Sequence, residues 1–276
     1  LLDLPVAELE GAVCLCGRHL DAATGCRHVF SCKKFGKTWR SNFMTAAFAD
    51  VLRSLPGAMR VVGDKTGSAP CLGTRTKVKA VNGVRQQVVS SVFPDLSFSG
   101  ISGDAPSVRW HADMVVPDPA ASTYCARAAD TPLHAAQLSH DKKLVKYVGS
   151  PGLIPPGHKF MPVAIELYGG IHESVVDQLR EWAELASTAD CGLPCPVVAA
   201  KILRVWRVSL SVSLLYARVG HVQDALRRIS EEREWQSAGA DRQRKRKIAQ
   251  QICRQRSALE LCAIVPRAGG GFARRG

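Results

Sequence analysis

The sequence predicts a mixed α/β fold in which helices flank a mixed sheet. Three observations support this prediction. Apolar residues recur at helical spacing in some segments and form short continuous runs in others. The Asn82-Gly83 dipeptide, between two segments of strand-forming residues, is the strongest short-range signal for a hairpin. Apolar residues make up 46% of the 276 residues, so the chain can bury a substantial core.

The expected elements follow one another as helix, hairpin, strand, helix, strand and further helices. Spacings of three and four between apolar residues predict the helices, and Pro56-Gly57 ends the first of them. We expect helices at 39–55, 133–148, 172–186, 197–219 and 220–260. Short apolar or alternating runs predict strands at 60–62, 74–81, 84–89, 93–98, 108–116 and 160–167.

The chain carries a strong positive charge that is concentrated towards its C-terminus. It has 37 Lys and Arg against 24 Asp and Glu, a net charge of +13. Residues 201–276 hold 17 of the basic and 6 of the acidic residues, which accounts for +11 of this excess. Such a charge favours a polyanionic partner, either nucleic acid or an anionic membrane surface. The most apolar stretch, 197–217, contains Lys201, Arg204 and Arg207, so we expect no membrane span.

The ten cysteines favour metal binding in a reducing, intracellular setting over a secreted disulfide scaffold. Several crowd into residues 14–32 and the others are scattered. A chain of this length also has no need of disulfides to stabilise its core. No signal peptide is visible, and because the chain starts at Leu1 we expect it to be part of a longer polypeptide.

The N-terminal cluster predicts a structural zinc site. Zinc takes four soft or borderline donors in a tetrahedron. The candidate ligands are Cys14, Cys16, His28 and Cys32. Gly17 and Gly25 permit the sharp turns that such a short knuckle needs. Cys26 is an alternative to His28 as the third ligand, and the sequence leaves this choice open.

Two separated aspartates predict a site for Mg²⁺ or Mn²⁺. Asp95 follows Pro94 at the start of a strand, and Asp113 lies in the next strand, 18 residues further on. Neighbouring strands could bring both carboxylates to one sheet edge, where hard oxygen ligands bind such ions. Lys143 and Lys146 lie three residues apart on one helix face and could stabilise negative charge on a phosphate.

Four other residues are of types that could bind a metal. Glu166, in an otherwise apolar strand, could complete the carboxylate site or be paired inside the core. His111, two residues before Asp113, is expected to be a solvated strand residue, although His-x-Asp could bind a metal. Cys191 and Cys195 have suitable spacing, but no partner ligands lie near them in the sequence, so we expect no metal there.

The order of these motifs resembles the C-terminal region of non-LTR retrotransposon polyproteins, in which a zinc knuckle and a restriction-enzyme-like endonuclease follow the reverse transcriptase. The family pattern has a CCHC knuckle, an Arg-x-Asn helix start, a Pro-Asp, a second Asp in a strand, a Lys-x-x-Lys-Tyr helix and a Phe-x-Pro-x-Ala-x-Glu strand that ends in Gly-Gly. The corresponding segments are 14–32, 40–42, 94–95, 113–116, 143–147 and 160–170.

The resemblance implies a restriction-endonuclease-like fold of the PD-(D/E)xK type and an enzyme that nicks target DNA to prime reverse transcription. It implies that Asp95 and Asp113 hold Mg²⁺ or Mn²⁺ and that Lys143 or Lys146 acts at the phosphate. The implied partners are DNA, RNA and a reverse transcriptase domain upstream in the same polypeptide. The implied location is the nucleus.

The resemblance also gives Arg40 and Asn42 a place in building the site or contacting nucleic acid. Two positions depart from the family pattern. Val115 stands where the parent nuclease motif has its lysine, and Cys26 falls where an aspartate is usual in the knuckle. The alternative is therefore a catalytically inactive, zinc-dependent nucleic-acid-binding module from a degenerate or repurposed element.

These features suggest three regions: a CCHC zinc knuckle at 1–36, a restriction-endonuclease-like core at 37–190, and a basic helical extension at 191–276. In the extension, a run of basic residues is suited to phosphate contacts or nuclear import. Its members are Arg242, Arg244, Lys245, Arg246 and Lys247.

Overall fold

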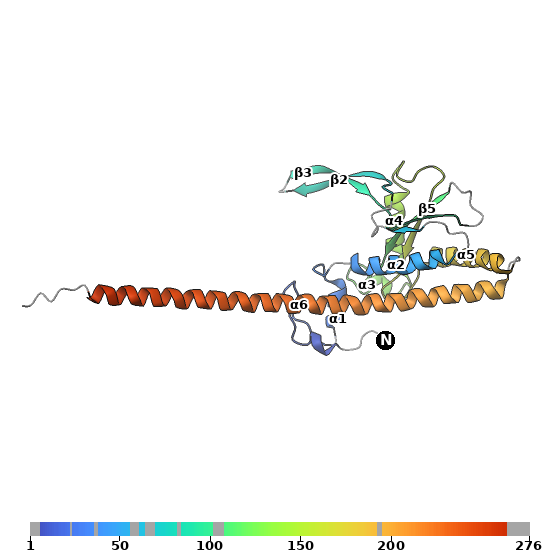
Figure 1. Ribbon diagram of the computed structural model, residues 1–276. Helices are drawn as coiled ribbons and strands as arrows, with labels where there is room; N and C mark the ends of the chain where they lie inside the picture. Colours follow the sequence, from blue (N-terminus) through green and yellow to red (C-terminus); the bar gives the residue numbers. More distant parts are fainter. Residues whose placement is uncertain are drawn as a thin grey trace, which may run out of the picture. The chain divides into compact units, whose positions relative to one another are not determined.

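A computed structural model of the chain describes residues 6–263, with the exception of 23, 36–37, 56–60, 64–69, 82–83, 102–107 and 192–194. The chain divides into two compact units, Leu1–Ala225 and Leu226–Gly276. The first unit contains the β-strands, and the second contains the C-terminal part of one long helix (Figure 1). The sequence favoured divisions after residues 36 and 190, whereas the first compact unit extends to Ala225.

Four strands form a mixed sheet in the first unit. They are β1 (Val62–Gly63), β4 (Leu96–Ser99), β5 (Arg109–Val115) and β6 (Lys159–Ala164), in the order β1-β4-β5-β6. β5 is antiparallel to β4 and parallel to β6. A parallel pair needs a crossover connection, and helices α3 (Cys125–Ala128) and α4 (His134–Tyr147) supply it. The predicted mixed sheet is therefore confirmed.

The predicted hairpin is present as a separate two-stranded sheet. β2 (Gly73–Val81) pairs antiparallel with β3 (Val84–Val92), and Val81 lies opposite Val84. The Asn82-Gly83 pair itself lies outside the described residues. At the base of the hairpin, Val92 belongs to a small buried cluster with Leu72, Tyr147 and Leu153. This cluster attaches the hairpin to the end of α4.

Helices α2 (Thr38–Arg53), α5 (Glu173–Cys191) and α6 (Pro196–Ala263) overlap helices that the sequence predicted. The short helices η1 (Ala7–Leu9) and α1 (Gly25–Ser31) lie in the N-terminal segment, where the sequence predicted no helix. The sequence predicted two successive helices where α6 is continuous. Gly220 lies at the predicted junction, but an interior glycine costs only about 1 kcal/mol relative to alanine. The helix packs through Ala217 and His221 on either side of Gly220, and both are buried.

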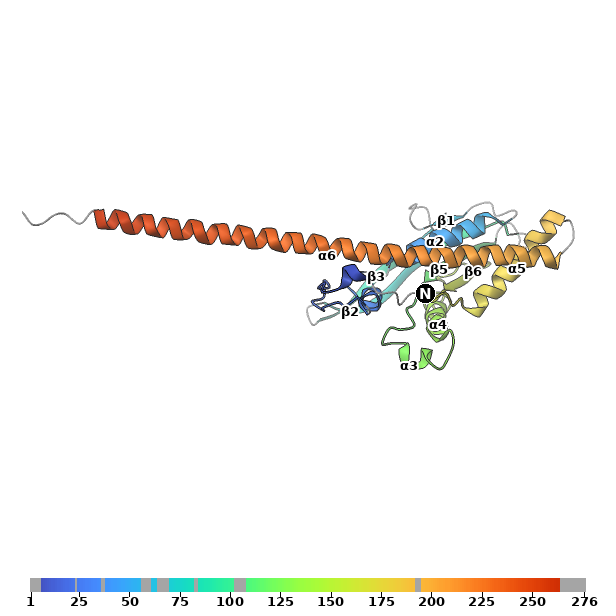
Figure 2. The same cartoon turned by 90° about the horizontal axis from the view of Figure 1, so that it is seen from below.

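One face of the sheet carries the aromatic core. Phe98 of β4 and Trp110 of β5 are cross-strand neighbours, with ring centroids 6.0 Å apart. Trp182 of α5 meets both rings edge-on at 5.8 Å and contacts Phe48 of α2 at 6.4 Å. Helices α2 and α5 therefore pack on this face. Figure 2 shows α2 and α4 on opposite sides of the strands.

The opposite face of the sheet is polar and faces α4. Because side chains alternate along a strand, Ser97, His111 and Asp113 point away from the aromatic core. All three are buried. The lysines of α4 reach Asp113 across this face. The tertiary structure thus places the predicted carboxylate site between the sheet and α4.

The N-terminal half of α6 belongs to the first unit. Trp206, Leu210 and Leu214 lie one turn apart along the helix and are buried. The Trp206 Nε1–H donates to Ser54 Oγ at 2.9 Å, which joins α6 to the end of α2. Among the described residues, no helix is long and apolar enough to cross a membrane.

Candidate metal centre and carboxylate site

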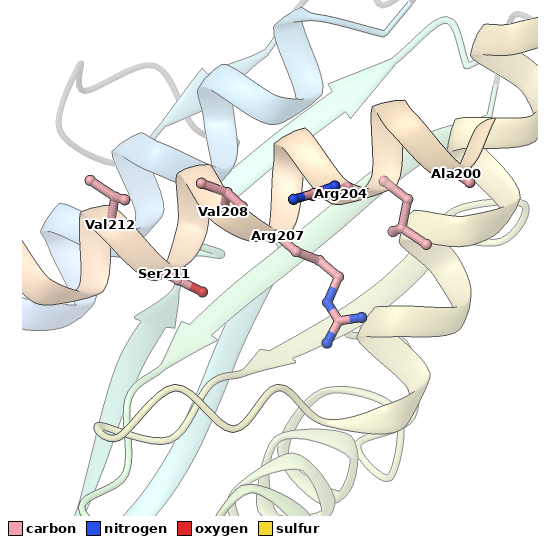
Figure 3. A pocket seen from close by; sticks show the side chains of 7 residues that line it. Ala200, Arg204, Arg207, Val208, Ser211 and Val212 are labelled. Atoms are coloured by element: carbon pink, nitrogen blue, oxygen red, sulfur yellow. The ribbon is translucent and has the colours of Figure 1, made fainter. Parts of the chain in front are cut away.

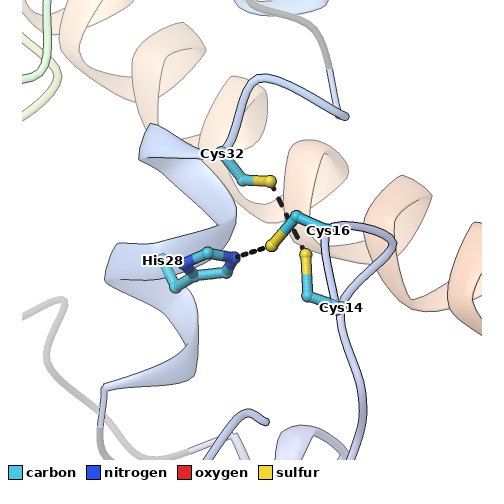
Figure 4. A group of neighbouring side chains, drawn as sticks. All are labelled: Cys14, Cys16, His28 and Cys32. Carbon is cyan, nitrogen blue, oxygen red and sulfur yellow. Dashed lines mark hydrogen bonds between the residues drawn. The ribbon is translucent and has the colours of Figure 1, made fainter. Parts of the chain in front are cut away.

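The N-terminal segment brings three thiols and one imidazole together (Figure 4). Cys14 and Cys16 lie in a tight turn, which the Gly17 N–H closes by donating to the Cys14 carbonyl at 2.7 Å. Gly17 has φ = 88°, a left-handed conformation that favours glycine. His28 lies on α1, and Cys32 follows the end of this helix one turn later. The turn therefore supplies Cys14 and Cys16, and the end of α1 supplies His28 and Cys32.

The geometry of the four side chains fits a structural zinc ion. Their candidate ligand atoms all lie within 4.8 Å of one another. Cys14 Sγ is 3.6 Å from Cys32 Sγ, and Cys16 Sγ is 3.3 Å from His28 Nε2. A tetrahedral zinc ion with bonds of about 2.3 Å to sulfur separates its sulfur ligands by about 3.8 Å. The donor set and the spacing therefore agree with the predicted zinc site.

His28, and not Cys26, is the member of this cluster that α1 supplies. Two residues on a helix differ by about 200° in direction, so Cys26 and His28 project from different sides of α1. Cys26 is buried, with 8% exposure, but is not among the four converging side chains. The choice that the sequence left open is decided by the helical direction of these two residues.

The protonation states of the metal-free cluster determine how zinc binding depends on pH. Burial raises the pKa of the Cys14 thiol to about 12. Backbone hydrogen bonding from Arg18 lowers the pKa of Cys16. Burial and the nearby Arg18 charge lower the pKa of His28, so the imidazole is neutral and can donate a lone pair. A bound zinc ion would displace the proton of Cys14 and leave a thiolate.

The knuckle is joined to the core through a buried arginine. Arg40 of α2 is 1% exposed, and its Nη2 donates to the Phe30 carbonyl of α1 at 3.1 Å. Its guanidinium also lies 5.8 Å from the Phe30 ring centroid. The prediction that Arg40 contacts nucleic acid is wrong for this conformation because a buried guanidinium cannot reach a phosphate. Asn42 is partly exposed on the same helix.

The two predicted aspartates lie side by side, Asp95 just before β4 and Asp113 on β5. Asp95 comes immediately before β4, and its Oδ2 accepts the N–H of Met114 at 2.6 Å. The Asp95 and Asp113 carboxyl groups are close enough to share a hydrogen bond. Asp113 is 4% exposed, on the polar face of β5. Residues 18 positions apart in the sequence thus form one carboxylate pair.

Both candidate lysines reach this pair from α4. Lys143 Nζ donates to Asp113 Oδ2 at 2.6 Å, and Lys146 Nζ lies 3.4 Å from the same oxygen. Lys146 Nζ also donates to the Tyr147 hydroxyl, which donates to the Phe93 carbonyl beside Asp95. The sequence left the choice between the lysines open, and the tertiary structure brings both to the site.

The charges at this site displace the pKa values in opposite directions. Burial and the neighbouring Asp113 raise the pKa of Asp95 to about 7. Burial alone would raise the pKa of Asp113 as well, but the charges of Lys143 and Lys146 lower it below its ordinary value. Burial lowers the pKa of Lys146. Two carboxylates with different proton affinities and two amines therefore share one half-buried site.

Glu166 and His111 have structural partners. Glu166 Oε1 accepts the N–H groups of Ala135 and Ala136 at 3.1 Å each, so it caps the start of α4. His111 is 1% exposed, so the prediction that it is solvated is wrong. It bonds to Ser97 Oγ through Nδ1 at 2.8 Å and to His158 through Nε2 at 2.9 Å.

The sequence reasoning missed this buried His111–His158 pair. The only local signal was a His two residues before Asp113, and His158 lies 47 residues further on. The pair shares the polar face of β5 with Asp113.

The basic run in the second unit lies on α6. Arg242, Arg246 and Lys247 are exposed, and the Arg242 Nε–H donates to the Ala238 carbonyl one turn earlier. The side chains of Arg244 and Lys245 lie outside the described residues, as does that of Cys191. Cys195 lies just before α6 and does not join the zinc-type cluster.

Comparison with known proteins leaves the chain without an assigned family. No family model, curated protein or solved structure matches it. The case for a function therefore depends on the chemistry of the two sites and on the sequence motifs that they contain.

Proposed function

We propose that this chain is the metal-dependent endonuclease region of a non-LTR retrotransposon polyprotein, with a restriction-endonuclease-like fold, and that it nicks target DNA to prime reverse transcription. The observation that supports this most is the convergence of Asp95, Asp113, Lys143 and Lys146. These residues come from the start of β4, from β5 and from α4, and form one carboxylate and amine cluster. Hydrolysis of a phosphodiester needs such a combination of hard oxygen ligands and cations.

In this proposal, Asp95 and Asp113 hold Mg²⁺ or Mn²⁺, whose charge offsets that of the scissile phosphate and activates water. Two carboxylates are a common protein contribution to such a site, because Mg²⁺ keeps several waters and substrate oxygens as its other ligands. With an ion held by Asp95 and Asp113, Lys143 and Lys146 would be the amines nearest to a bound phosphate. Both amines are partly exposed, with 22% and 29% side-chain exposure, so a backbone phosphate can approach them.

The basic run on α6 and the zinc knuckle are assigned to binding nucleic acid. The exposed Arg242, Arg246 and Lys247 present a positive surface on α6 that is suited to DNA or RNA phosphates. The zinc knuckle would hold the segment at 14–32 in one conformation. In the full polypeptide, an upstream reverse transcriptase would extend the nicked end in the nucleus.

The test is a nicking assay on supercoiled plasmid with Mg²⁺ or Mn²⁺. We expect Asp113→Asn to abolish nicking, because the substitution keeps the volume of the side chain and removes the ligand charge. We expect Lys143→Ala to lower the rate about 100-fold, which is the usual effect of losing one group that stabilises developing charge. The matched control is Lys142→Ala, the exposed neighbour on the same helix, which changes net charge equally and should nick at the native rate.

Zinc content and circular dichroism show whether each variant keeps its fold, and gel shifts show whether it still binds DNA. Nicking that survives Asp113→Asn, or that responds equally to Lys142→Ala and Lys143→Ala, would contradict the proposed site. The absence of nicking by the native chain, with DNA still shifted, would favour the alternative of an inactive binding module. Val115, at the position of the parent motif's lysine, is the feature that favours this alternative.

A further inference from the structure

An apolar stripe runs along the N-terminal half of α6, on its solvent side. It consists of Val205, Val208, Val212, Leu215 and Val219, which we call the valine stripe. Their exposures range from 44% to 64%, far above those of ordinary core valines and leucines. Contiguous exposed apolar surface of this kind marks interaction sites in soluble proteins. Figure 3 shows Val208 and Val212 one turn apart on the helix, beside Arg204 and Arg207.

The opposite face of this helix is already occupied. Trp206, Leu210, Leu214 and Ala217 are 5% exposed or less and pack on the first unit. The helix therefore cannot rotate to bury the valine stripe without exposing this second apolar face. An open groove beside the stripe, lined in part by Ala200, Val208 and Val212, leaves room for a partner along the same edge.

The spacing of the valine stripe is that of a coiled-coil seam. Successive members are separated by three, four, three and four residues, which is the heptad pattern that keeps one line of side chains facing a partner helix. Val205, Val212 and Val219 occupy the a positions, and Val208 and Leu215 occupy the d positions. β-branched residues at a, with a leucine at one of the d positions, favour a parallel two-stranded coiled coil.

The flanking residues are compatible with a second copy of the same chain. In a parallel pair, each g position faces the following e position of the partner. Arg204 would face Ser209 of the second copy, and Ser211 would face Tyr216 of the second copy. These pairings bring no like charges together, even though the chain carries a net charge of +13. Each α6 is also ordered by its own unit, so pairing does not have to supply the cost of forming an isolated helix.

We propose that the valine stripe is a self-association surface, through which two copies of the chain pair in parallel along the N-terminal half of α6. The stripe spans about two heptads, which makes a small interface and a weak, concentration-dependent dimer. This inference does not depend on nuclease activity. It gives the chain a two-fold arrangement.

The first test is sedimentation equilibrium of the full chain, loaded with zinc and without nucleic acid, over a range of protein concentrations. The native chain should rise from a mass of 29.8 kDa towards twice that value. Val212→Asp places a charge at the centre of the seam and should weaken association at least about tenfold. The matched control is Val197→Asp, at a valine that is 64% exposed, against 44% for Val212, in the first turn of α6 before the stripe, and it should associate like the native chain.

A native chain that stays at 29.8 kDa at every concentration would overturn the proposal and point to a different partner for the stripe. Equal weakening by Val212→Asp and Val197→Asp would overturn it as well. Orientation is tested by short thiol crosslinkers on Val208→Cys and Val212→Cys, compared with the native chain. A parallel pair places both positions opposite their own copies, so both variants should give new crosslinked dimers. Crosslinking at one position alone would overturn the parallel arrangement.

Discussion

The assignment of His28 as the fourth zinc ligand predicts how strongly single substitutions disturb metal binding. His28→Ala removes an atom that lies 3.3 Å from Cys16 Sγ, inside a cluster whose ligand atoms are all within 4.8 Å. Cys26→Ala removes a thiol that is outside this cluster. Changing a residue that only supports a ligand usually costs 10- to 100-fold in affinity. Losing His28 itself should therefore cost more than about 100-fold, and losing Cys26 should cost little.

The protonation of Cys14 also predicts how strongly zinc affinity at this site depends on pH. Burial raises the pKa of Cys14 to about 12, so this thiol is protonated throughout the neutral range and must lose its proton to bind zinc. Each unit of pH below that pKa costs a factor of ten. From pH 8 to pH 6 the affinity should fall about 100-fold through Cys14 alone. Because the pKa of His28 is lowered, its imidazole is largely unprotonated over this range and adds little to the pH dependence of zinc affinity.

The assay is competition for Zn²⁺ between the chain and a chromophoric chelator, repeated at several pH values for the native chain and both variants. Stoichiometry is measured by elemental analysis, with one zinc ion expected per cluster of three thiols and one imidazole. Two results would refute the reasoning. One is equal loss of zinc in Cys26→Ala and His28→Ala, and the other is an affinity that does not change between pH 8 and pH 6.

Two further predictions concern the carboxylate site and the core. The pKa of Asp95 rises from an ordinary 3.8 to about 7, so the folded metal-free chain should be stabilised by this group at acid pH and should lose that contribution as pH rises through 7. Mn²⁺ affinity, measured by calorimetry, should conversely rise about tenfold from pH 6 to pH 8, and Asp95→Asn should remove both effects. Trp182→Ala should lower the free energy of unfolding by about 3 to 5 kcal/mol in urea titrations, because Trp182 is 1% exposed and touches three aromatic rings. Trp235→Ala, at a 67% exposed tryptophan, should leave the unfolding midpoint unchanged, and equal losses in the two variants would contradict the proposed packing.

The sequence predicted the elements of this fold well because their signals are local. The spacing of apolar residues located α2 and α4 within two residues of their ends, and Asn82-Gly83 located the hairpin between β2 and β3. The single helix α6 was predicted as two, with the junction between residues 219 and 220. Packing on both sides of Gly220 outweighs its small intrinsic cost.

The candidate site residues also fall into two groups: those that local sequence identified and those whose role required the tertiary structure. The four zinc-type ligands are close in sequence, so their spacing was enough to group them, whereas the choice of His28 over Cys26 required the direction of each side chain on α1. Arg40 shows the opposite case. A motif suggested a nucleic-acid contact, but its burial against Phe30 makes it a link between the knuckle and the core.

By itself, the sequence determined which residues could do metal and phosphate chemistry, since residue type and short spacing carry that information. It also determined the strong positive charge and the run of basic residues near the C-terminus. Only the tertiary structure decided that Lys143 and Lys146 both reach Asp113, 30 and 33 residues away. It also decided that Glu166 caps α4 and that the valine stripe faces outward. Contacts between distant segments depend on how helices and strands pack, and no local pattern specifies that packing.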